Sequence, residues 1–150
     1  NLYHILYAGD GATGLPLDSY LKTIIGSVTS GYGESGRKIS IHTDFQSIEI
    51  DPKRATSIGI ILNEFLTNSI KYAFQDRESI TVNIALRMDE GRIKLYFSDD
   101  GTGLPENFNS ELSAGLGLKL VNLLASQMKG EFRIADGDAS AFEVALPYLN

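Results

Sequence analysis

The sequence contains no cysteine, which excludes disulfide bonds and any site built on a thiolate. It also has no membrane-length apolar run and no secretory signal, so we expect a soluble, cytoplasmic chain. Positive charge is scarce, since 13 lysines and arginines against 19 acidic residues leave a net charge of -6. This balance argues against a nucleic-acid partner and against direct contact with an anionic membrane.

The composition is that of one globular domain. Its 150 residues are 43% hydrophobic and 21% charged, which is enough apolar material for a real core. The chain begins at Asn1 without an initiating methionine, and we expect a piece of a longer protein. Residues 1–14 combine a short apolar stretch with a glycine-rich run that lacks a lysine at P-loop spacing. We therefore expect residues 1–14 to be a tail and linker, and residues 15–150 to be the domain.

The most informative stretch is Ile58 to Phe74, which belongs to a predicted helix that has Asp51 as its N-cap and Pro52 as its first residue. Apolar residues recur at helical spacing and cover half of this helix, which predicts a buried face: Ile58, Ile61, Leu62, Phe65, Leu66, Ile70 and Ala73. The other half carries polar side chains: Asn63, Glu64, Thr67, Asn68, Lys71 and Gln75.

The polar half is open to two interpretations of about equal weight. It can be a solvated face, but Asn63, Thr67, Asn68 and Ser69 together cost about 2 kcal/mol of helix propensity relative to alanine. The alternative is a functional stripe along the helix. A carboxylate, a carboxamide and an ammonium group at one-turn intervals offer a base, an oxygen ligand for a hard cation and a phosphate-binding charge.

The rest of the chain alternates between helices and strands. We expect a helix from Ser19 to about Val28 capped by Asp18, and another helix to about Met128 with Gly130 at its C′ position. Residues with period-two hydrophobicity predict strands that form a sheet covered by helices on one side. These strands are Lys38 to Phe45, Ile80 to Met88, Ile93 to Ser98, Glu131 to Ala135 and Ala141 to Leu146. We expect a turn at Asp89-Glu90-Gly91 to join the second and third of them as an antiparallel hairpin.

Two glycine-containing segments are candidate ligand sites. Asp99 ends a strand beside the turn Asp99-Asp100-Gly101-Thr102-Gly103, where its carboxylate suits an exocyclic amine such as that of adenine. This loop is also compatible with an unusual turn or a calcium-like site. We expect Glu106 to Ser113 to be a mobile flap. After it, Gly115 and Gly117 open a helix whose N–H groups can bind phosphate.

Together these segments resemble a known family. NEFLTNSIKYAF resembles the N box, DDGTGLP the G1 box and GLGLKLV the G2 box of the GHKL ATP-binding superfamily. Within that superfamily the sequence is most similar to sensor histidine kinases of the HWE-like or HisKA-type-2-like subfamily, from roughly Ser19 to Tyr148. The resemblance implies a two-layer α/β sandwich of the Bergerat type, with a mixed, mostly antiparallel sheet and helices on one face. It also implies Mg²⁺ and ATP as ligands.

The resemblance implies a role for each matched residue. Asn68 corresponds to the magnesium ligand, Glu64 to the catalytic acidic residue and Asp99 to the acceptor for the adenine amino group. The remaining cofactor-binding positions contact the base or the phosphates: Lys71, Tyr72, Gly101, Gly103, Gly115, Leu116, Gly117, Leu118 and Ser140. The chain departs from the family pattern at Ser113, in place of the first G2 glycine, and at Ala139-Ser140, in place of Gly-Thr, and it has no evident F box.

The implied function is that of an ATP-binding catalytic domain that transfers the γ-phosphoryl group to a histidine outside this fragment. Neither His4 nor His42 has the context of a phosphoacceptor. The expected partners are an upstream helical hairpin, whose tail lies within residues 1–14, and the receiver domain of a response regulator. The alternatives are an ATPase clamp in which Glu64 activates water, and a nucleotide-gated binding module such as an anti-sigma-like switch or a pseudokinase.

Overall fold

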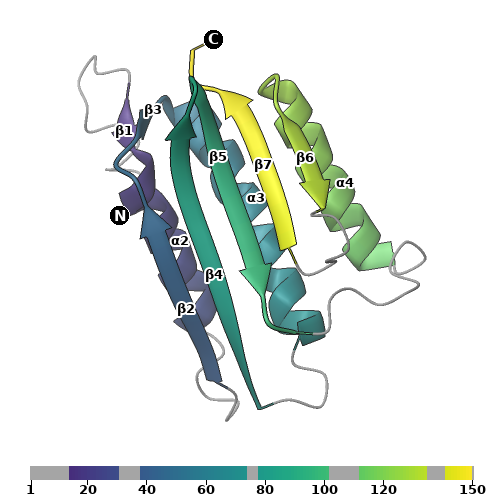
Figure 1. Ribbon diagram of the computed structural model, residues 1–150. Helices are drawn as coiled ribbons and strands as arrows, with labels where there is room; N and C mark the ends of the chain where they lie inside the picture. The colour runs from purple at the N-terminus through teal and green to yellow at the C-terminus, as the bar shows by residue number, and fades with distance from the viewer. Residues whose placement is uncertain (1–13, 31–37, 74–77, 102–111, 135–140, 150) are drawn as a thin grey trace.

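The protein has two layers, a β-sheet and a layer of helices. A computed structural model describes residues 14–30, 38–73, 78–101, 112–134 and 141–149. Within these ranges one face of the sheet is covered by α2 (Leu17–Ser30), α3 (Pro52–Ala73) and α4 (Leu112–Gln127), which lie behind the sheet in Figure 1. The predicted α/β sandwich with helices on one face is confirmed. In the described part of the chain, no helix is long and apolar enough to span a membrane.

The sheet is mixed and mostly antiparallel, as predicted. Its strands lie in the order β2 (Lys38–Phe45), β4 (Ser79–Asp89), β5 (Arg92–Asp99), β7 (Ala141–Pro147) and β6 (Glu131–Ile134). The β2 and β4 strands run parallel, and the other neighbours run antiparallel. Two short strands, β1 (Leu15–Pro16) and β3 (Glu49–Ile50), pair separately. Sequence periodicity did not predict them because two residues are too short to show a period.

The turn between β4 and β5 fixes the position of the next loop. Glu90 and Gly91 have φ angles of 51° and 79°, and two successive left-handed residues form the tight turn that matches the twist of a hairpin. The register that follows pairs Asp89 with Arg92 at one end and Val82 with Asp99 at the other. The hairpin therefore places Asp99 at a defined position at the end of β5.

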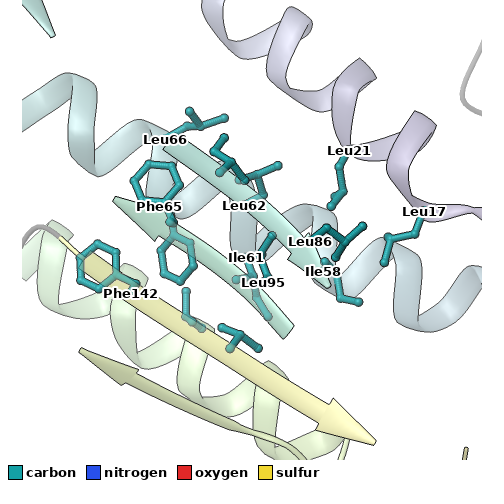
Figure 2. Close-up of a cluster of buried hydrophobic side chains, with 14 of the residues drawn as sticks. Leu17, Leu21, Ile58, Ile61, Leu62, Phe65, Leu66, Leu86, Leu95 and Phe142 are labelled. Carbon is teal, nitrogen blue, oxygen red and sulfur yellow. The ribbon is translucent and has the colours of Figure 1, made fainter. Parts of the chain in front are cut away.

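Alternating side chains of the strands and one face of α3 form the core between the layers (Figure 2). The buried residues of α3 include most of those that the helical spacing predicted: Ile58, Ile61, Leu62, Phe65, Leu66 and Ile70. On β4 every second residue is buried: Ile80, Val82, Ile84 and Leu86. The predicted buried faces of these elements are confirmed.

A cluster of aromatic rings holds the middle of α3 on the sheet. The ring of Phe65 lies 4.9 Å from Phe142 on β7, 5.4 Å from Phe97 on β5 and 5.8 Å from Phe132 on β6, measured between centroids. Such offset pairs add about 0.5–1.5 kcal/mol each beyond their buried area. Since Phe97 precedes Asp99 by two residues, the cluster fixes α3 next to the end of β5.

The N-terminus of α3 is capped as predicted and is tied to the end of β7. Asp51 Oδ2 accepts a hydrogen bond from the Arg54 backbone N–H at 3.0 Å, and Asp51 Oδ1 accepts one from Arg54 Nε at 2.6 Å. The two terminal nitrogens of Arg54 donate to the carbonyl oxygens of Pro147 and Tyr148, each at 2.8 Å. Burial by itself raises the pKa of Asp51, but the hydrogen bonds and charge of Arg54 together lower it below its ordinary value of 3.8.

We expect Asp51→Asn to reduce the free energy of unfolding by about 1 kcal/mol at pH 7, because asparagine can still cap the helix but loses the ion pair with Arg54. Since the pKa of Asp51 is lowered by folding, its contribution is complete above 3.8 and is lost as pH falls through the lower folded-state value. Urea unfolding of both proteins at neutral and acidic pH measures this difference. Asp44→Asn is the control, since Asp44 pairs with Arg87 on the exposed surface. A gap that persists unchanged at pH 2 would contradict the assignment.

Two helix starts differ from the prediction. The α2 helix begins at Leu17, so Asp18 lies in its first turn and is not its N-cap; the Leu17 N–H instead donates to the Ile48 carbonyl at 2.8 Å. The α4 helix begins at Leu112, so Leu112 and Ser113 belong to a helix and not to a flap. Leucine and alanine at its start favour the helical state and offset the glycine that follows. The remaining part of the predicted flap, residues 106–111, lies outside the described residues.

The end of α4 also differs from the prediction. Lys129, with a φ angle of 61°, occupies the left-handed C′ position, and Gly130 follows at C″. The Lys129 N–H donates to the Ser126 carbonyl at 2.9 Å and the Gly130 N–H to the Ala125 carbonyl at 2.8 Å, the two bonds of a Schellman motif. A methyl group on Gly130 would lie 2.2 Å from the Ala145 carbonyl oxygen. Glycine is therefore needed here for close approach to β7.

Candidate functional site

The polar residues in the second half of α3 divide into two groups. Asn63 and Thr67 are exposed, and the Thr67 hydroxyl donates to the Asn63 carbonyl at 2.7 Å, as on an ordinary solvated face. Asn68 and Ser69 are 6% and 4% exposed, and among the described residues they are the buried polar side chains. A solvated face therefore explains the first pair and does not explain the second.

Asn68 is a candidate ligand because one of its buried polar atoms has no hydrogen-bond partner. Its Nδ2 atom is enclosed and makes no hydrogen bond. An unsatisfied buried group of this kind costs about 1–3 kcal/mol, so its presence calls for an explanation. An asparagine side chain also offers a neutral oxygen, a donor type that magnesium accepts. The residue thus fits a role that is completed when a ligand arrives.

The described residues suit magnesium as part of a complex with phosphate. They contain no group of three or more histidine, aspartate or glutamate side chains that could hold a metal ion alone. Magnesium usually takes one or two protein oxygens, several waters and the phosphates of its substrate. Asn68 and Glu64 lie one turn apart on α3 and provide oxygens of that kind. The structure describes Asp99 to Gly101 of the DDGTG loop, and these residues give no support for a calcium-like site. Residues 102–105 lie outside the described residues.

Asp99 ends β5 beside the C-terminal end of α3 (Figure 1). Its Oδ2 atom accepts a hydrogen bond from the Ser69 hydroxyl, and its Oδ1 atom accepts one from the Gly101 N–H at 2.9 Å. The next residue, Asp100, turns toward β4: its Oδ1 accepts from the Thr81 N–H at 2.9 Å, and its own N–H donates to the Thr81 carbonyl at 3.0 Å. The two adjacent aspartates therefore differ in role, since Asp100 closes the loop onto β4 and Asp99 faces α3.

Glu64 lies against α4 at a position where α4 has no side chain. A methyl group on Gly117 would come within 2.5 Å of Glu64 Oε2, so glycine at this position leaves room for the carboxylate. Sequence reasoning assigned Gly117 to phosphate binding alone and did not find this packing. Because α4 begins at Leu112, the N–H groups without helical partners are those of its first turn, before Gly117.

The structure brings together a subset of the predicted site residues. Glu64, Asn68, Asp99, Gly101 and Gly117 gather where the second half of α3 meets the end of β5 and the first half of α4. Others belong to the same elements: Lys71 is exposed near the end of α3, Leu118 is buried in the core, and Tyr72, Gly115 and Leu116 lie in the helices. Gly103 and Ser140 lie outside the described residues.

Sequence reasoning did not assign a role to Ser69. Its signal was the unfavourable helix propensity that it shares with Asn63, Thr67 and Asn68, which could not separate the buried members of the group from the exposed ones. Its partner, Asp99, is 30 residues away in the sequence, so the contact depends on how α3 packs against β5.

A cavity of about 490 Å³ lies at the opposite end of α3, between its first turns and the end of α4. It is lined by residues that include Asp51, Ser57 and Lys129, and none of the predicted nucleotide-binding residues is among them. Glu64 and Asn68 lie in the other half of α3, away from this cavity.

Comparisons with known proteins show the family to which the chain belongs. The sequence model of the family described as "Histidine kinase-, DNA gyrase B-, and HSP90-like ATPase" matches residues 53–150, more than half of the chain. Blue-light-activated histidine kinase 2 of Erythrobacter litoralis is 27% identical over 82% of this chain and 35% of its own length. Sensor histidine kinase PdtaS of Mycobacterium tuberculosis is 30% identical over 65% of this chain and 20% of its own length.

A solved structure gives the same result in three dimensions. The histidine kinase domain of the blue-light-activated kinase EL346 from Erythrobacter litoralis matches with a TM-score of 0.82 and 25% identity, over 98% of this chain and 70% of that chain. The chain spans about a third or less of the curated relatives named above. The chain belongs to the histidine kinase-, DNA gyrase B- and HSP90-like ATPase family, as the ATP-binding catalytic domain of a sensor histidine kinase.

Proposed function

We propose that this domain binds ATP with Mg²⁺ between the second half of α3, the loop after β5 and the first half of α4, and transfers the γ-phosphoryl group to a histidine outside the chain. The observation that supports the proposal is the pair of buried polar residues Asn68 and Ser69 on α3, of which Ser69 donates a hydrogen bond to Asp99. An amide oxygen suits a cation and a carboxylate suits the adenine amine, so this part of α3 is the region that we assign to the nucleotide. Family membership supplies ATP as the ligand.

Each residue of the site has a distinct task in this proposal. Asp99 accepts a hydrogen bond from the adenine amino group, and Asn68 holds the magnesium ion. Glu64 is the catalytic carboxylate, held against Gly117, where it can accept the proton that the attacking group loses. The other predicted positions line the site or shape the loops and helices around it: Lys71, Tyr72, Gly101, Gly103, Gly115, Leu116, Gly117, Leu118 and Ser140.

The domain acts mainly by positioning and by neutralising charge. Phosphoryl transfer has a loose transition state with charge spread over the phosphoryl oxygens, so the protein gains most by aligning the reactants. Magnesium, when bound, neutralises part of the phosphate charge. Asp99 and the end of β5 fix one end of the nucleotide, and Lys71 and the start of α4 attract the other end.

The acceptor histidine and the remaining partners lie outside the site. We place the tail of an upstream phosphoacceptor hairpin in residues 1–14 and the catalytic domain in residues 15–150. The parent protein would then pass the phosphoryl group to the receiver domain of a response regulator, in the cytoplasm. The names of relatives such as PdtaS and blue-light-activated histidine kinase 2 support a histidine kinase as the parent protein.

The proposal is tested by supplying the acceptor separately. This chain is incubated with ATP labelled at the γ-phosphate, with and without a phosphoacceptor hairpin from a related kinase. We expect acid-labile label on the hairpin and none on this chain. Release of inorganic phosphate with no labelled hairpin would favour an ATPase clamp, and tight ATP binding with neither product would favour a nucleotide-gated binding module.

Asn68→Ala is expected to weaken Mg-ATP binding at least about tenfold and to change the affinity for metal-free ATP little, because the asparagine oxygen serves the cation. The substitution also removes a buried amide nitrogen that has no partner, so we expect no loss of thermal stability. Calorimetric titration with and without magnesium, alongside melting curves, measures both effects.

Thr67→Ala is the matched control, since Thr67 is the exposed neighbour whose hydroxyl contacts its own helix. It should bind Mg-ATP as the parent does. If Asn68→Ala weakened ATP equally with and without magnesium, Asn68 would have no role as a metal ligand.

A further inference from the structure

The cavity of about 490 Å³ between the first turns of α3 and the end of α4 has a positively charged lining, although the net charge of the chain is -6. The cations that line it are Lys53, Arg54 and Lys129, and the carboxylate that lines it is Asp51. Asp51 is paired with Arg54, so the charges of these two residues cancel. The net charge of the lining is therefore that of the two lysines.

Side chains around this cavity carry hydrogen-bond donors that the described residues do not use. The ammonium groups of Lys53 and Lys129 form no ion pair in the described part of the chain. The Ser57 hydroxyl and the Gln127 amide likewise have no hydrogen-bond partner within the described ranges. Thr56 differs, since its hydroxyl donates to a backbone carbonyl of its own helix at 2.9 Å. Donors from two helices are thus available to a ligand in the cavity.

Both lysines occupy positions that are unfavourable for their residue type. Lys53 is in the first turn of α3, where a cation lies at the positive end of the helix dipole, and this turn contains no acidic residue. Lys129 has a φ angle of 61°, a left-handed conformation that is strained for a residue with a side chain. The end of α4 does suit a cation, but this explains only Lys129. An anion in the cavity that they share would account for both lysines.

We propose that this cavity binds a phosphate dianion, as the free ion or on a small molecule, through Lys53, Lys129 and the Ser57 hydroxyl. A phosphate monoester carries a charge of about −1.5 to −2 at pH 7, which matches two ammonium groups better than the single charge of a carboxylate does. Lysine binds phosphate as a point charge, without the planar geometry that arginine requires. The inference does not rest on the nucleotide site, which lies at the other end of α3.

The size and lining of the cavity also suit the organic part of a phosphorylated molecule. A volume of about 490 Å³ is in the range of small-molecule sites, which span about 300–1,000 Å³. The side chain of Met128, which is 7% exposed, lines the cavity and offers an adaptable apolar surface.

NMR titration of the isotope-labelled chain without nucleotide tests the proposal. The probes are inorganic phosphate, glycerol phosphate and acetate, added to the parent chain and to three variants. Lys53→Gln keeps a good helix former, and Lys129→Gly places glycine in a left-handed conformation, so we expect both variants to fold. Lys119→Gln is the matched control, since Lys119 is an exposed lysine of α4 that does not line the cavity.

We expect both phosphate probes to shift the amide signals of Lys53, Ser57 and Lys129, and acetate to need on the order of tenfold higher concentration. Lys53→Gln and Lys129→Gly should each weaken phosphate binding on the order of tenfold, and Lys119→Gln should leave it unchanged. Tighter binding of glycerol phosphate than of inorganic phosphate would identify an organic phosphate as the ligand, and equal binding would identify the free ion.

Three results would overturn the inference: no shifts around the cavity, equal binding of acetate and phosphate, or the same phosphate affinity in all three variants. Phosphate that shifted only signals in the second half of α3 would belong to the nucleotide site and would count against the cavity. None of these outcomes would change the case for ATP, because that site is tested with other residues.

Discussion

Gly130→Ala is expected to lower the free energy of unfolding by about 3 kcal/mol or more, a large share of the stability of a domain of this size. The added methyl group would lie 2.2 Å from the Ala145 carbonyl oxygen and 2.9 Å from Leu146 Cβ. These atoms belong to β7, which is paired on both sides with β5 and β6. A strand held in this way cannot move aside, so the end of α4 has to shift instead. Urea unfolding of the variant and the parent measures the loss.

Substitution of the neighbouring residue, Lys129, provides a control that is not expected to lower the free energy of unfolding. Lys129→Gly places glycine where the backbone is already left-handed, with a φ angle of 61°, a conformation that costs non-glycine residues about 1–2 kcal/mol. Part of this gain is cancelled because glycine makes the unfolded chain more flexible. We therefore expect Lys129→Gly to be neutral or slightly stabilising. A loss in Lys129→Gly as large as that in Gly130→Ala would show that the whole turn resists substitution and that contact with β7 is not the cause.

Local sequence signals predicted the elements whose determinants are local. The cap at Asp51, the buried stripe of α3 and the hairpin at Glu90 and Gly91 depend on residues within a few positions of one another. The alternation in β4 predicted which of its faces is buried, because one face meets helices and the other does not. These features were correct because short-range spacing determines them.

The remaining features depend on contacts between distant segments. Gly130 was taken for a C′ residue because glycine is common there, whereas its neighbour in β7 determines the need for glycine. Asp18 was taken for an N-cap because the pairing of β1 with β3, which sets where α2 begins, leaves no local signal. In the site, the resemblance to the N, G1 and G2 boxes predicted Asn68, Asp99 and the glycines of the two loops as site residues. The burial of Ser69 and its hydrogen bond to Asp99 were not predicted, because they arise only when α3 packs on β5.

Asp99→Asn is expected to keep the fold and to reduce the affinity for ATP by about 1.5–3 kcal/mol, the range for a lost hydrogen bond to a charged group. Asparagine can retain the contacts on the protein side: its oxygen can accept from the Gly101 N–H, and its NH₂ group can donate to the Ser69 hydroxyl oxygen. On the ligand side it can then present a donor to the amino group of adenine. A site built for one hydrogen-bond polarity discriminates strongly when that polarity is lost.

A change of the nucleotide base tests the same hydrogen bond to Asp99 by altering the ligand instead of the protein. GTP should bind poorly to the parent, since guanine carries a carbonyl where adenine carries an amine, and two acceptors would face each other. The competing explanation is that Asp99 only caps the turn through its bond with the Gly101 N–H. In that case Asp99→Asn would melt at a lower temperature and bind ATP normally once folded. Calorimetric titration of ATP and GTP into both proteins, with their melting curves, separates the two, because a folded variant with unchanged ATP affinity would remove Asp99 from the adenine site.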